Sequence, residues 1–428
     1  MFVELIWVAP FVFLLGSIAI LPLSSKKWWE KNFSLVSFGL GLIVILHYLF
    51  QLRNTHSLIH TGLEYVSFIA LIGSLFVVSG GIHINVKGEA TPLINCAFLL
   101  VAAVLSNFLG TTGASAVLIR PWIRMNKYRL TAFHIVFFIF LVSNIGGGLT
   151  PMGDPPLFLG YLNGVPFFWV LKQVWPIWIL TIGLLLSIFF VVDNINFRKA
   201  PLSVRQKETA AGEEWKFLGI RNIFFLFMII AAVFINHPRF LREAIMVLAA
   251  VLSYKMTPRD IHESNDFNFG PIKEVAILFL GIFATMIPAL EWLERYAGQL
   301  GINSPGQFFW GSGILSSVLD NAPTYLNFLS ASLGLFANPS VTHGPLSPEG
   351  NGVAMLLANH PNYIRAISVG SVFFGAVTYI GNGPNFLVKS IADQANVKTP
   401  SFFGYFFKYS LPILIPVFFL IWFLFFRV

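Results

Sequence analysis

Long apolar runs separated by short polar interruptions fill this chain, and their lengths predict membrane helices. A helix needs roughly 17–25 apolar residues to cross a bilayer. Ten runs fit single crossings, two of them broken in the middle, at about 5–23, 33–50, 63–82, 131–163 (broken), 167–192, 217–235, 241–256, 274–290, 363–392 (broken) and 402–426. The pattern predicts an all-α polytopic membrane protein.

Two further apolar segments, 92–123 and 307–336, have a different pattern. Each is about 30 residues long, too long for one straight span and too short for two. Each also holds a polar kink near its middle, at 106–113 in the first and at 320–324 in the second. A re-entrant hairpin fits both best, because irregular backbone at membrane depth must be buried in protein or line a cavity. The alternative is one kinked crossing.

The order of elements is repeated along the chain. Three spans, a hairpin, a broken helix and a final span occupy residues 1–195 and again 217–428, and the segment 196–216 links the two halves. Within the breaks, 144–147 matches 379–385, and Leu105-Ser106-Asn107 matches Leu319-Asp320-Asn321. The sequence therefore predicts two inverted-topology repeats, each with a re-entrant hairpin and a broken transmembrane helix, as in many secondary transporters.

Composition and charge agree with a membrane protein and indicate its orientation. The chain is 56% hydrophobic and 11% charged, whereas soluble domains carry roughly 25% charged residues. The net charge of +8 belongs to loops and reports orientation, with no sign of nucleic-acid binding. Lysines follow the first span, and basic residues follow the first hairpin and fill the linker, whereas 337–362 has none. The positive-inside rule thus predicts a multi-pass cell (inner) membrane protein with its N-terminus outside and the linker 196–216 cytoplasmic. Arg239 and Arg242 would lie outside and count mildly against this orientation.

The stretch 143–156 carries the most distinctive chemistry. Its three consecutive glycines and three prolines cannot continue a helix, since glycine costs about 1 kcal/mol and proline about 3 kcal/mol in a helix interior. It also holds a carboxylate, Asp154, between two apolar runs. An ionisable residue at a helix break inside a membrane protein marks a binding site.

Hydroxyl, amide and carboxylate side chains gather at both breaks and both hairpin kinks. Such oxygen ligands suit a small hard cation such as sodium. The candidates are Ser106, Asn107, Thr111, Thr112, Asn144, Gly147, Thr150, Asp154, Asp320, Asn321, Thr324, Thr378, Asn382 and Asn385, with Asp320, Asp154, Asn107 and Asn321 as the sodium ligands. Burial favours the protonated carboxyl group and a bound cation favours the charged one, so one carboxylate can exchange a proton for a cation. Alternatively, Asp154 and Asp320 cap the helices that follow them.

These motifs resemble those of a known superfamily. The stretch 144–156 is similar to the N-I-G-G-x-x-T-x-x-G-D-P-P motif of the ion-transporter superfamily, which includes NhaD-type sodium/proton antiporters, ArsB-type arsenite exporters and citrate or dicarboxylate carriers. The stretch 319–324 resembles the L-D-N-A-x-T hairpin of the NhaD-type branch. This resemblance covers the whole membrane region. It implies inverted repeats, a homodimer with scaffold and transport domains, and elevator-type alternating access.

Departures from the superfamily pattern bear on the substrate. Sodium-coupled dicarboxylate carriers have Ser-Asn-Thr at both hairpin tips, whereas here the first tip reads Ser106-Asn107-Phe108 and the second carries Asp320. The added negative charge favours a cation. We therefore expect a sodium/proton antiporter that needs no cofactor and uses sodium as substrate or coupling ion. An arsenite or citrate/dicarboxylate-type anion carrier is the alternative, and a membrane enzyme with a carboxylate pair is a third possibility.

Overall fold

Helices follow one another along nearly all of the described chain. The computed structural model describes residues 4–85, 91–199, 216–235, 237–238, 240–336 and 352–427. Up to residue 199 the elements are η1 (Leu5–Val8), α1 (Ala9–Ser24), α2 (Lys26–Leu46), η2 (His47–Gln51), α3 (Thr55–Gly80), β1 (His83–Asn85), α4 (Pro92–Met125), α5 (Ala132–Leu141), η3 (Ile145–Gly147), α6 (Pro155–Leu162) and α7 (Phe167–Lys199).

The remaining elements begin at residue 216. They are β2 (Lys216–Leu218), α9 (Asn222–Val233), α10 (Leu241–Met256), α11 (Arg259–Ser264), α12 (Gly270–Tyr296), η4 (Ala297–Gln299), α13 (Pro305–Val318), α14 (Asn321–Phe336), α15 (Gly352–Asn359), α16 (Pro361–Phe373), η5 (Phe374–Val377), α17 (Gly383–Gln394), α18 (Phe402–Tyr405), η6 (Phe406–Leu414) and α19 (Ile415–Phe425). Within the described residues, β1 and β2 form an antiparallel two-stranded sheet. Most of the predicted linker 196–216 and the start of the loop 337–362 lie outside the described residues.

Membrane-spanning length and an apolar surface confirm the predicted fold class. In the described part of the chain, seven helical segments are long and apolar enough to cross a membrane: Leu5–Pro22, Lys27–Gln51, Thr55–Gly80, Pro92–Met125, Phe167–Lys199, Gly270–Gln299 and Phe402–Phe425. Their outward faces expose large apolar side chains, among them Leu35 (71%) and Phe50 (74%). A surface of this kind fits lipid, because large exposed apolar areas are rare on soluble monomers. The protein is an all-α polytopic membrane protein.

The segment α4 is a helical hairpin of two arms. Its 34 residues are therefore not one straight helix across the membrane. Its arms meet at the base, where the side chains of Asn95 and Asn126 are hydrogen-bonded (2.7 Å), and the rings of Phe98 and Trp122 stack 5.4 Å apart. The chain turns at Gly110, whose φ of 73° only glycine adopts without strain. This geometry confirms the predicted hairpin over the kinked single helix.

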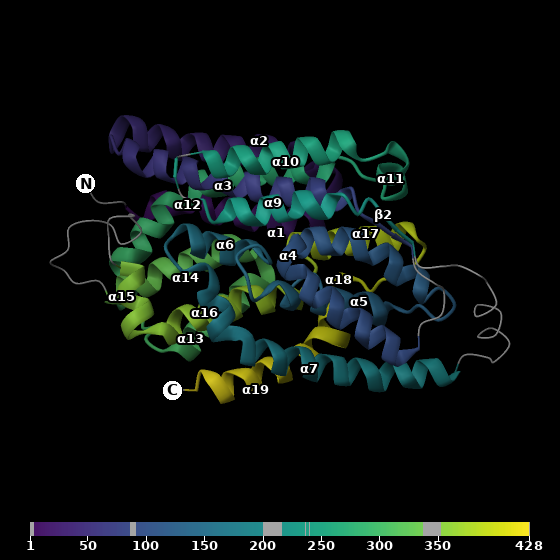
Figure 1. The fold of residues 1–428 in the computed structure, drawn as a ribbon. Coiled ribbons are helices and arrows are strands. Elements are labelled where there is room, and N and C mark those ends of the chain that lie inside the picture. The colour runs from purple at the N-terminus through teal and green to yellow at the C-terminus, as the bar shows by residue number, and fades with distance from the viewer. Residues whose placement is uncertain are drawn as a thin grey trace.

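The second predicted hairpin consists of α13 and α14. The rings of Phe308 in α13 and Phe328 in α14 pack edge to face with centroids 5.9 Å apart, so the two arms run side by side. Ser304 and Gln307 form a capping box that begins α13, and the helix ends at Val318. Figure 1 shows the base of α4 and the base of α13–α14 at opposite ends of the molecule. Entry of the two hairpins into a membrane from opposite faces stays a prediction.

Both predicted breaks are present. In the first, α5 ends at Leu141, a short 3-10 turn crosses the glycines, and α6 begins at Pro155. In the second, α16 ends at Phe373 and α17 begins at Gly383. Proline at the first position of a helix loses no hydrogen bond, which explains why α6 restarts where it does. The breaks place non-helical backbone in the interior of the protein.

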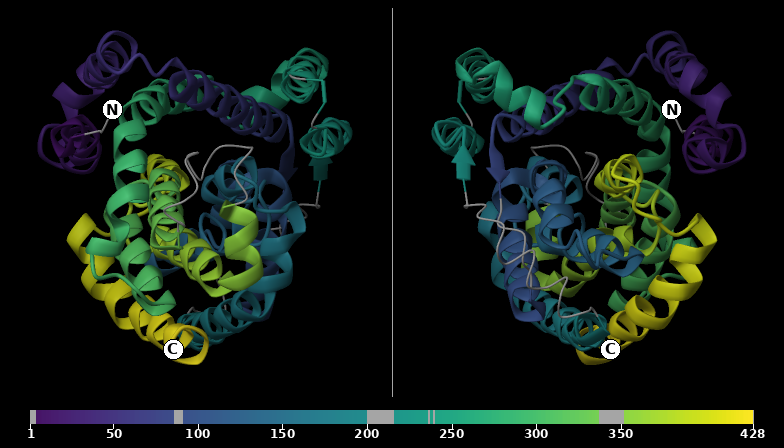
Figure 2. Two further views of the ribbon diagram at one scale, coloured as in Figure 1. Left: turned by 90° about the vertical axis from the view of Figure 1, so that its left-hand side faces the viewer. Right: turned by 90° about the vertical axis from the view of Figure 1, so that its right-hand side faces the viewer.

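The helices form two layers. We call α1, α2, α3, α9, α10 and α12 the cover layer, and α4 to α7 with α13 to α19 the site layer (Figure 1). Figure 2 shows the cover layer arching over the site layer. The layers meet where α12 packs on α14 and where α3 packs on α4 and α6. Polar bonds between them include Asn163 to Glu64 (2.8 Å) and an ion pair between Arg120 and Asp266 (2.9 Å).

Candidate ion-binding site

Asp154 lies at the point where the first break meets the turns of both hairpins. Its carboxylate is 1% exposed and accepts hydrogen bonds from three side chains. These donors are Thr111 Oγ1 in the first hairpin (2.7 Å), Asn321 Nδ2 in the second hairpin (2.5 Å) and Asn382 Nδ2 in the second break (3.1 Å). Asp154 makes no capping bond to α6. The capping alternative is therefore wrong for this residue, and its carboxylate instead joins four separate segments.

The second carboxylate, Asp320, does act as a cap. Its Oδ1 accepts a hydrogen bond from the Ala322 backbone amide (3.1 Å) in the first turn of α14, and Thr324 Oγ1 donates to its backbone carbonyl (2.9 Å). The carboxylate is near enough to that of Asp154 for the two to repel one another. In the described part of the chain, neither residue forms an ion pair with Lys, Arg or His. The site is thus acidic and lacks a resident counter-charge from these residues.

Two amide oxygens at the site have no hydrogen-bond donor among the described residues. They are Asn321 Oδ1 and Asn144 Oδ1, and both residues are fully buried. The orientation of each amide is fixed by its nitrogen: Asn321 Nδ2 donates to Asp154, and Asn144 Nδ2 donates to Ile139 O (2.8 Å) and Asn385 Oδ1 (2.7 Å). Turning either amide would place oxygen against oxygen. A buried acceptor without a donor is rare in native proteins and needs an explanation such as water or an ion.

Ser106, Asn107 and Thr150 hold the first break against the first hairpin. Asn107 Nδ2 donates to Gly146 O (2.7 Å), and its Oδ1 accepts from the Leu149 amide (3.0 Å). Thr150 Oγ1 donates to Asn107 O (2.6 Å), and Ser106 Oγ donates to Val142 O (2.9 Å). Because both ends of the Asn107 amide are used, the structure gives it a positioning role. The role of Asn107 as a sodium ligand stays a prediction from the sequence; in this structure its Oδ1 already accepts one hydrogen bond.

The second break repeats the hydrogen bonds of the first in a register that the sequence comparison missed. Thr378 Oγ1 donates to Ser317 O (2.5 Å) in the hairpin, as Thr150 does to Asn107 O. Each threonine hydroxyl also accepts from the glycine amide three residues later, at Gly153 and Gly381. The matching segments are therefore 147–156 and 375–384, both reading Gly-x-x-Thr-x-x-Gly-Asp/Asn-x-Pro. The predicted pairing of 144–147 with 379–385 is wrong, and so is that of 105–107 with 319–321, because Ser317 takes the place of Asn107 in these bonds. In the corrected register Asn382 corresponds to Asp154.

The other predicted residues occupy different places around this centre. Asn385 bridges the breaks: its Nδ2 donates to Gly375 O (2.7 Å) and Thr378 O (2.9 Å), and its Oδ1 accepts from Asn144. Gly147 allows a close backbone approach, since a Cβ there would lie 2.8 Å from Gly153 O. Thr112 lines a cavity on the cover-layer side. Apart from Thr112, the other twelve predicted positions thus gather within the hairpin turns and breaks that surround Asp154.

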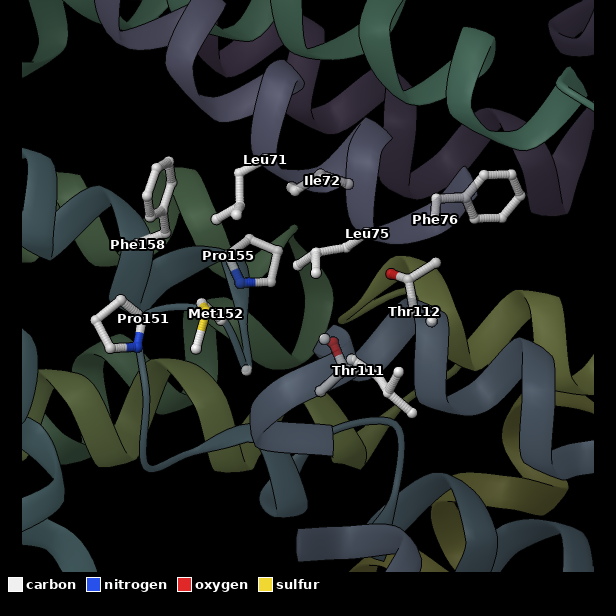
Figure 3. Close-up of a pocket in the computed structure, with 14 residues that line it drawn as sticks. Leu71, Ile72, Leu75, Phe76, Thr111, Thr112, Pro151, Met152, Pro155 and Phe158 are labelled. Carbon is white, nitrogen blue, oxygen red and sulfur yellow. The ribbon is translucent and has the colours of Figure 1, made fainter. Parts of the chain in front are cut away.

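Two cavities lie between the layers. The smaller, about 20 Å³, lies between α3 and the first hairpin, and holds roughly one water molecule. Figure 3 shows Leu71 and Leu75 of α3 facing Thr111, Thr112 and Met152 across it. The larger, about 280 Å³, opens between the layers toward α11 and includes the Arg120–Asp266 pair. The larger cavity therefore lies at the same end of the molecule as the base of the first hairpin.

A second buried polar cluster, absent from the sequence analysis, lies at the base of the first hairpin. Asp193, at the end of α7, pairs with the Arg129 guanidinium and accepts from Asn95 Nδ2 (2.9 Å). His134 Nε2 lies 3.0 Å from Asp193 Oδ1, and the Thr131 amide donates to its Nδ1 (3.3 Å). This places the imidazole proton on Nε2, so His134 is neutral and donates to Asp193. Asp193, Arg129 and His134 all lie near span ends in the sequence, where they resemble ordinary interfacial residues.

Comparison with known proteins identifies one family. The sequence model of the family CitMHS_2, described as "Putative citrate transport", matches residues 2–426. No curated protein matches the chain. The match covers both hairpins and both breaks, so it takes in all segments that meet at Asp154.

Proposed function

The chain belongs to this citrate-transport family and is a secondary transporter of that type, and we propose that it exchanges sodium ions for protons. One observation carries the proposal. Two buried amide oxygens without donors, Asn144 Oδ1 and Asn321 Oδ1, accompany a buried carboxylate whose partners are all neutral. Oxygen atoms in this combination suit a small hard cation. A bound sodium ion would also supply the counter-charge that Asp154 lacks.

The chemistry of exchange follows from this charge balance. An isolated carboxylate is unfavourable in a dry interior, so it binds either a proton or a cation. Asp154 is the principal coupling carboxylate in this proposal because it contacts both hairpins and the second break. Asp320 adds a second negative charge that disfavours an empty, doubly ionised site. Sodium binding then releases a proton, and proton binding releases sodium.

The two-layer arrangement supports alternating access of the elevator type. The hydrogen bonds of the two breaks correspond, and the hairpins open toward opposite ends of the molecule (Figure 1). Both features support an inverted repeat with domains 1–195 and 217–428. In this proposal the site layer slides against the cover layer, which breaks contacts such as Asn163–Glu64. A homodimer is a further expectation from the superfamily resemblance.

The family description favours a second candidate, transport of citrate or another anion with a cation. The amide nitrogens around Asp154 already donate to protein oxygens. Within the described residues, no arginine or lysine forms an ion pair with Asp154 or Asp320. The ion pairs therefore bring no positive side chain to the site that could neutralise a polyanion. These features rank the anion carrier second, whether its substrate is citrate or arsenite.

A vesicle assay distinguishes the two candidates. Everted vesicles or proteoliposomes with a trapped pH dye should respond to sodium or lithium and ignore citrate. Uptake of radioactive citrate with no sodium-dependent pH change would contradict antiport and favour the anion carrier.

Cysteine labelling tests the proposed orientation. Lys127, after the first hairpin, and Asn359, in α15, are both exposed. In a Cys96→Ala background, Lys127→Cys should react with a membrane-impermeant reagent only from the cytoplasm, and Asn359→Cys only from outside. Reaction of both from one side would contradict the inverted topology.

A further inference from the structure

The helices α14 and α16 bury hydroxyl groups that have no hydrogen-bond partner among the described residues. They include Tyr325 Oη in α14 and the Oγ atoms of Ser368 and Ser371 in α16, and also Ser330 Oγ farther along α14. Tyr325 and Ser371 are fully buried and Ser368 is 2% exposed. The two helices pack against each other. The hydroxyls of Tyr325 and Ser368 are close enough to interact with one another, but they do not meet the geometry of a direct hydrogen bond. Each unsatisfied buried polar group destabilises the fold. An apolar side chain would fill the same space without that cost.

The unpartnered groups form a line that begins at the proposed ion site. Asn321 starts α14 next to Asp154, and Tyr325 lies one helical turn later on the same face. Ser371 lies near the inner end of α16, where its carbonyl accepts from Ser316, and Ser368 lies one turn back. Asn321 Oδ1 is itself unpartnered. Four unsatisfied polar atoms thus occupy two successive turns of two adjacent helices.

Gly160 keeps space beside this line. It belongs to α6, the helix that begins after Asp154, and a Cβ at this position would collide with the Tyr325 hydroxyl. Buried water typically makes about three hydrogen bonds to polar groups that are otherwise unsatisfied. Hydroxyls of Tyr and Ser both donate and accept, so a chain of them with water can pass a proton along. By contrast, Tyr405, equally buried in the same layer, donates to Ala376 O (2.8 Å) and needs no water.

We propose that ordered water between α14 and α16, held by Tyr325, Ser368, Ser371 and Asn321, carries the proton that is exchanged at Asp154. This inference rests on the proposed function. It places the route of the proton inside the site layer, between α14 and α16. The proton moves by relay: each water or hydroxyl accepts one proton and releases another, so that none is consumed.

Sodium self-exchange provides a measurement that needs no proton. Proteoliposomes with equal pH and equal sodium on both sides exchange radioactive sodium without protonation of the site, whereas sodium/proton exchange requires it. Tyr325→Phe should slow sodium/proton exchange by about tenfold or more and leave sodium self-exchange at the wild-type rate. Tyr405→Phe, the matched control, should alter neither rate. Loss of both activities in Tyr325→Phe, or an unchanged sodium/proton rate, overturns the proton route.

A melting-temperature measurement and the wild-type exchange rate distinguish the remaining explanations. A dry, unpartnered hydroxyl would be destabilising, so its removal in Tyr325→Phe would raise the melting temperature of the purified protein; a hydroxyl that holds water predicts an unchanged or lower value. A clearly raised melting temperature overturns the proposal. Wild-type protein with no sodium/proton exchange overturns both this inference and the proposed function, whereas a normal wild type with an insensitive Tyr325→Phe overturns the proton route alone.

Discussion

Asp154 and Asp193 are both buried carboxylates of the site layer, and they differ in what balances their charge. Asp193 pairs with the permanently charged Arg129, and neutral His134 and Asn95 complete its hydrogen bonds. Asp154 has three neutral donors and no cationic partner among the described residues. Both carboxylates are therefore well supplied with hydrogen bonds, and the difference between them lies in the counter-charge.

This difference separates a structural cluster from a site that can exchange ligands. An arginine cannot give up its proton in a protein, so the Asp193 pair has one stable charge state and fixes the base of the first hairpin to α7. The charge of Asp154 must be balanced by something that can leave, a proton or a cation. Four predictions test this distinction: three concern transport, from the largest expected effect to the smallest, and the one on Asp193 concerns stability.

Replacement of Asp154 should have the largest effect on transport. Asp154→Asn removes the charge and keeps the shape, and it should lower sodium/proton exchange by roughly a hundredfold or more, equivalent to about 3 kcal/mol. The protein should still fold, because an amide oxygen can accept two of the three hydrogen bonds. Sodium-induced proton release from purified protein should disappear. Wild-type proton release by this variant would mean that another carboxylate couples the ions.

Replacement of Asp193 should affect stability instead. Asp193→Asn leaves the Arg129 guanidinium buried without its partner, which should cost about 3–5 kcal/mol. The protein that does fold should exchange ions at the normal rate per molecule. The double variant Arg129→Met/Asp193→Leu should be more stable than Asp193→Asn, because it leaves no unpaired charge. Melting temperatures in detergent measure the order of stability of these variants. A loss of exchange in correctly folded Asp193→Asn would contradict the purely structural role that separates Asp193 from Asp154.

Asp154 could be predicted from the sequence because the residues that mark the site are its neighbours in the chain. Glycine and proline within an apolar run mark a break, and a carboxylate there is conspicuous without any knowledge of the fold. The hairpins were also predictable, since their lengths fit no straight span. Asp193 gave no comparable signal, because its partner Arg129 lies 64 residues away in the chain and both residues sit near span ends.

Two other features needed the structure for different reasons. The repeat register could not be chosen from short matches of Asn and Gly, and the bonds of Thr150 and Thr378 correct it. Tyr325 was overlooked as one aromatic residue among many, although its spacing of four from Asn321 places both on one helix face. A pattern of positions predicts which face a side chain occupies. It does not predict whether a hydroxyl on that face finds a partner.

A third prediction concerns the backbone behind Asp154. A Cβ at Gly147 would lie 2.5 Å from Thr111 Cγ2 and 2.8 Å from Gly153 O, so the hydrogen bond from Thr111 to Asp154 must shift. Gly147→Ala should lower exchange by roughly tenfold to thirtyfold, the equivalent of about 1.4–2 kcal/mol, in a protein that still inserts. Gly183→Ala in α7, where nothing lies within 4 Å, is the control and should retain full activity. Normal exchange by Gly147→Ala would mean that the break tolerates movement.

The smallest effect should come from Asp320, which shares features of both carboxylates. Like Asp154, it is a carboxylate without an ion-pair partner in the described part of the chain; its Oδ1, however, caps α14. Asn caps a helix about as well as Asp, so Asp320→Asn should fold with wild-type stability. It should lose only the long-range attraction of a second negative charge, which weakens sodium binding by about tenfold, or roughly 1.4 kcal/mol. Sodium titration of proton release measures this shift: the amplitude should persist while the midpoint moves to higher sodium. An unchanged midpoint would make Asp320 a cap alone, and a complete loss of proton release would make it, and not Asp154, the residue that couples the two ions.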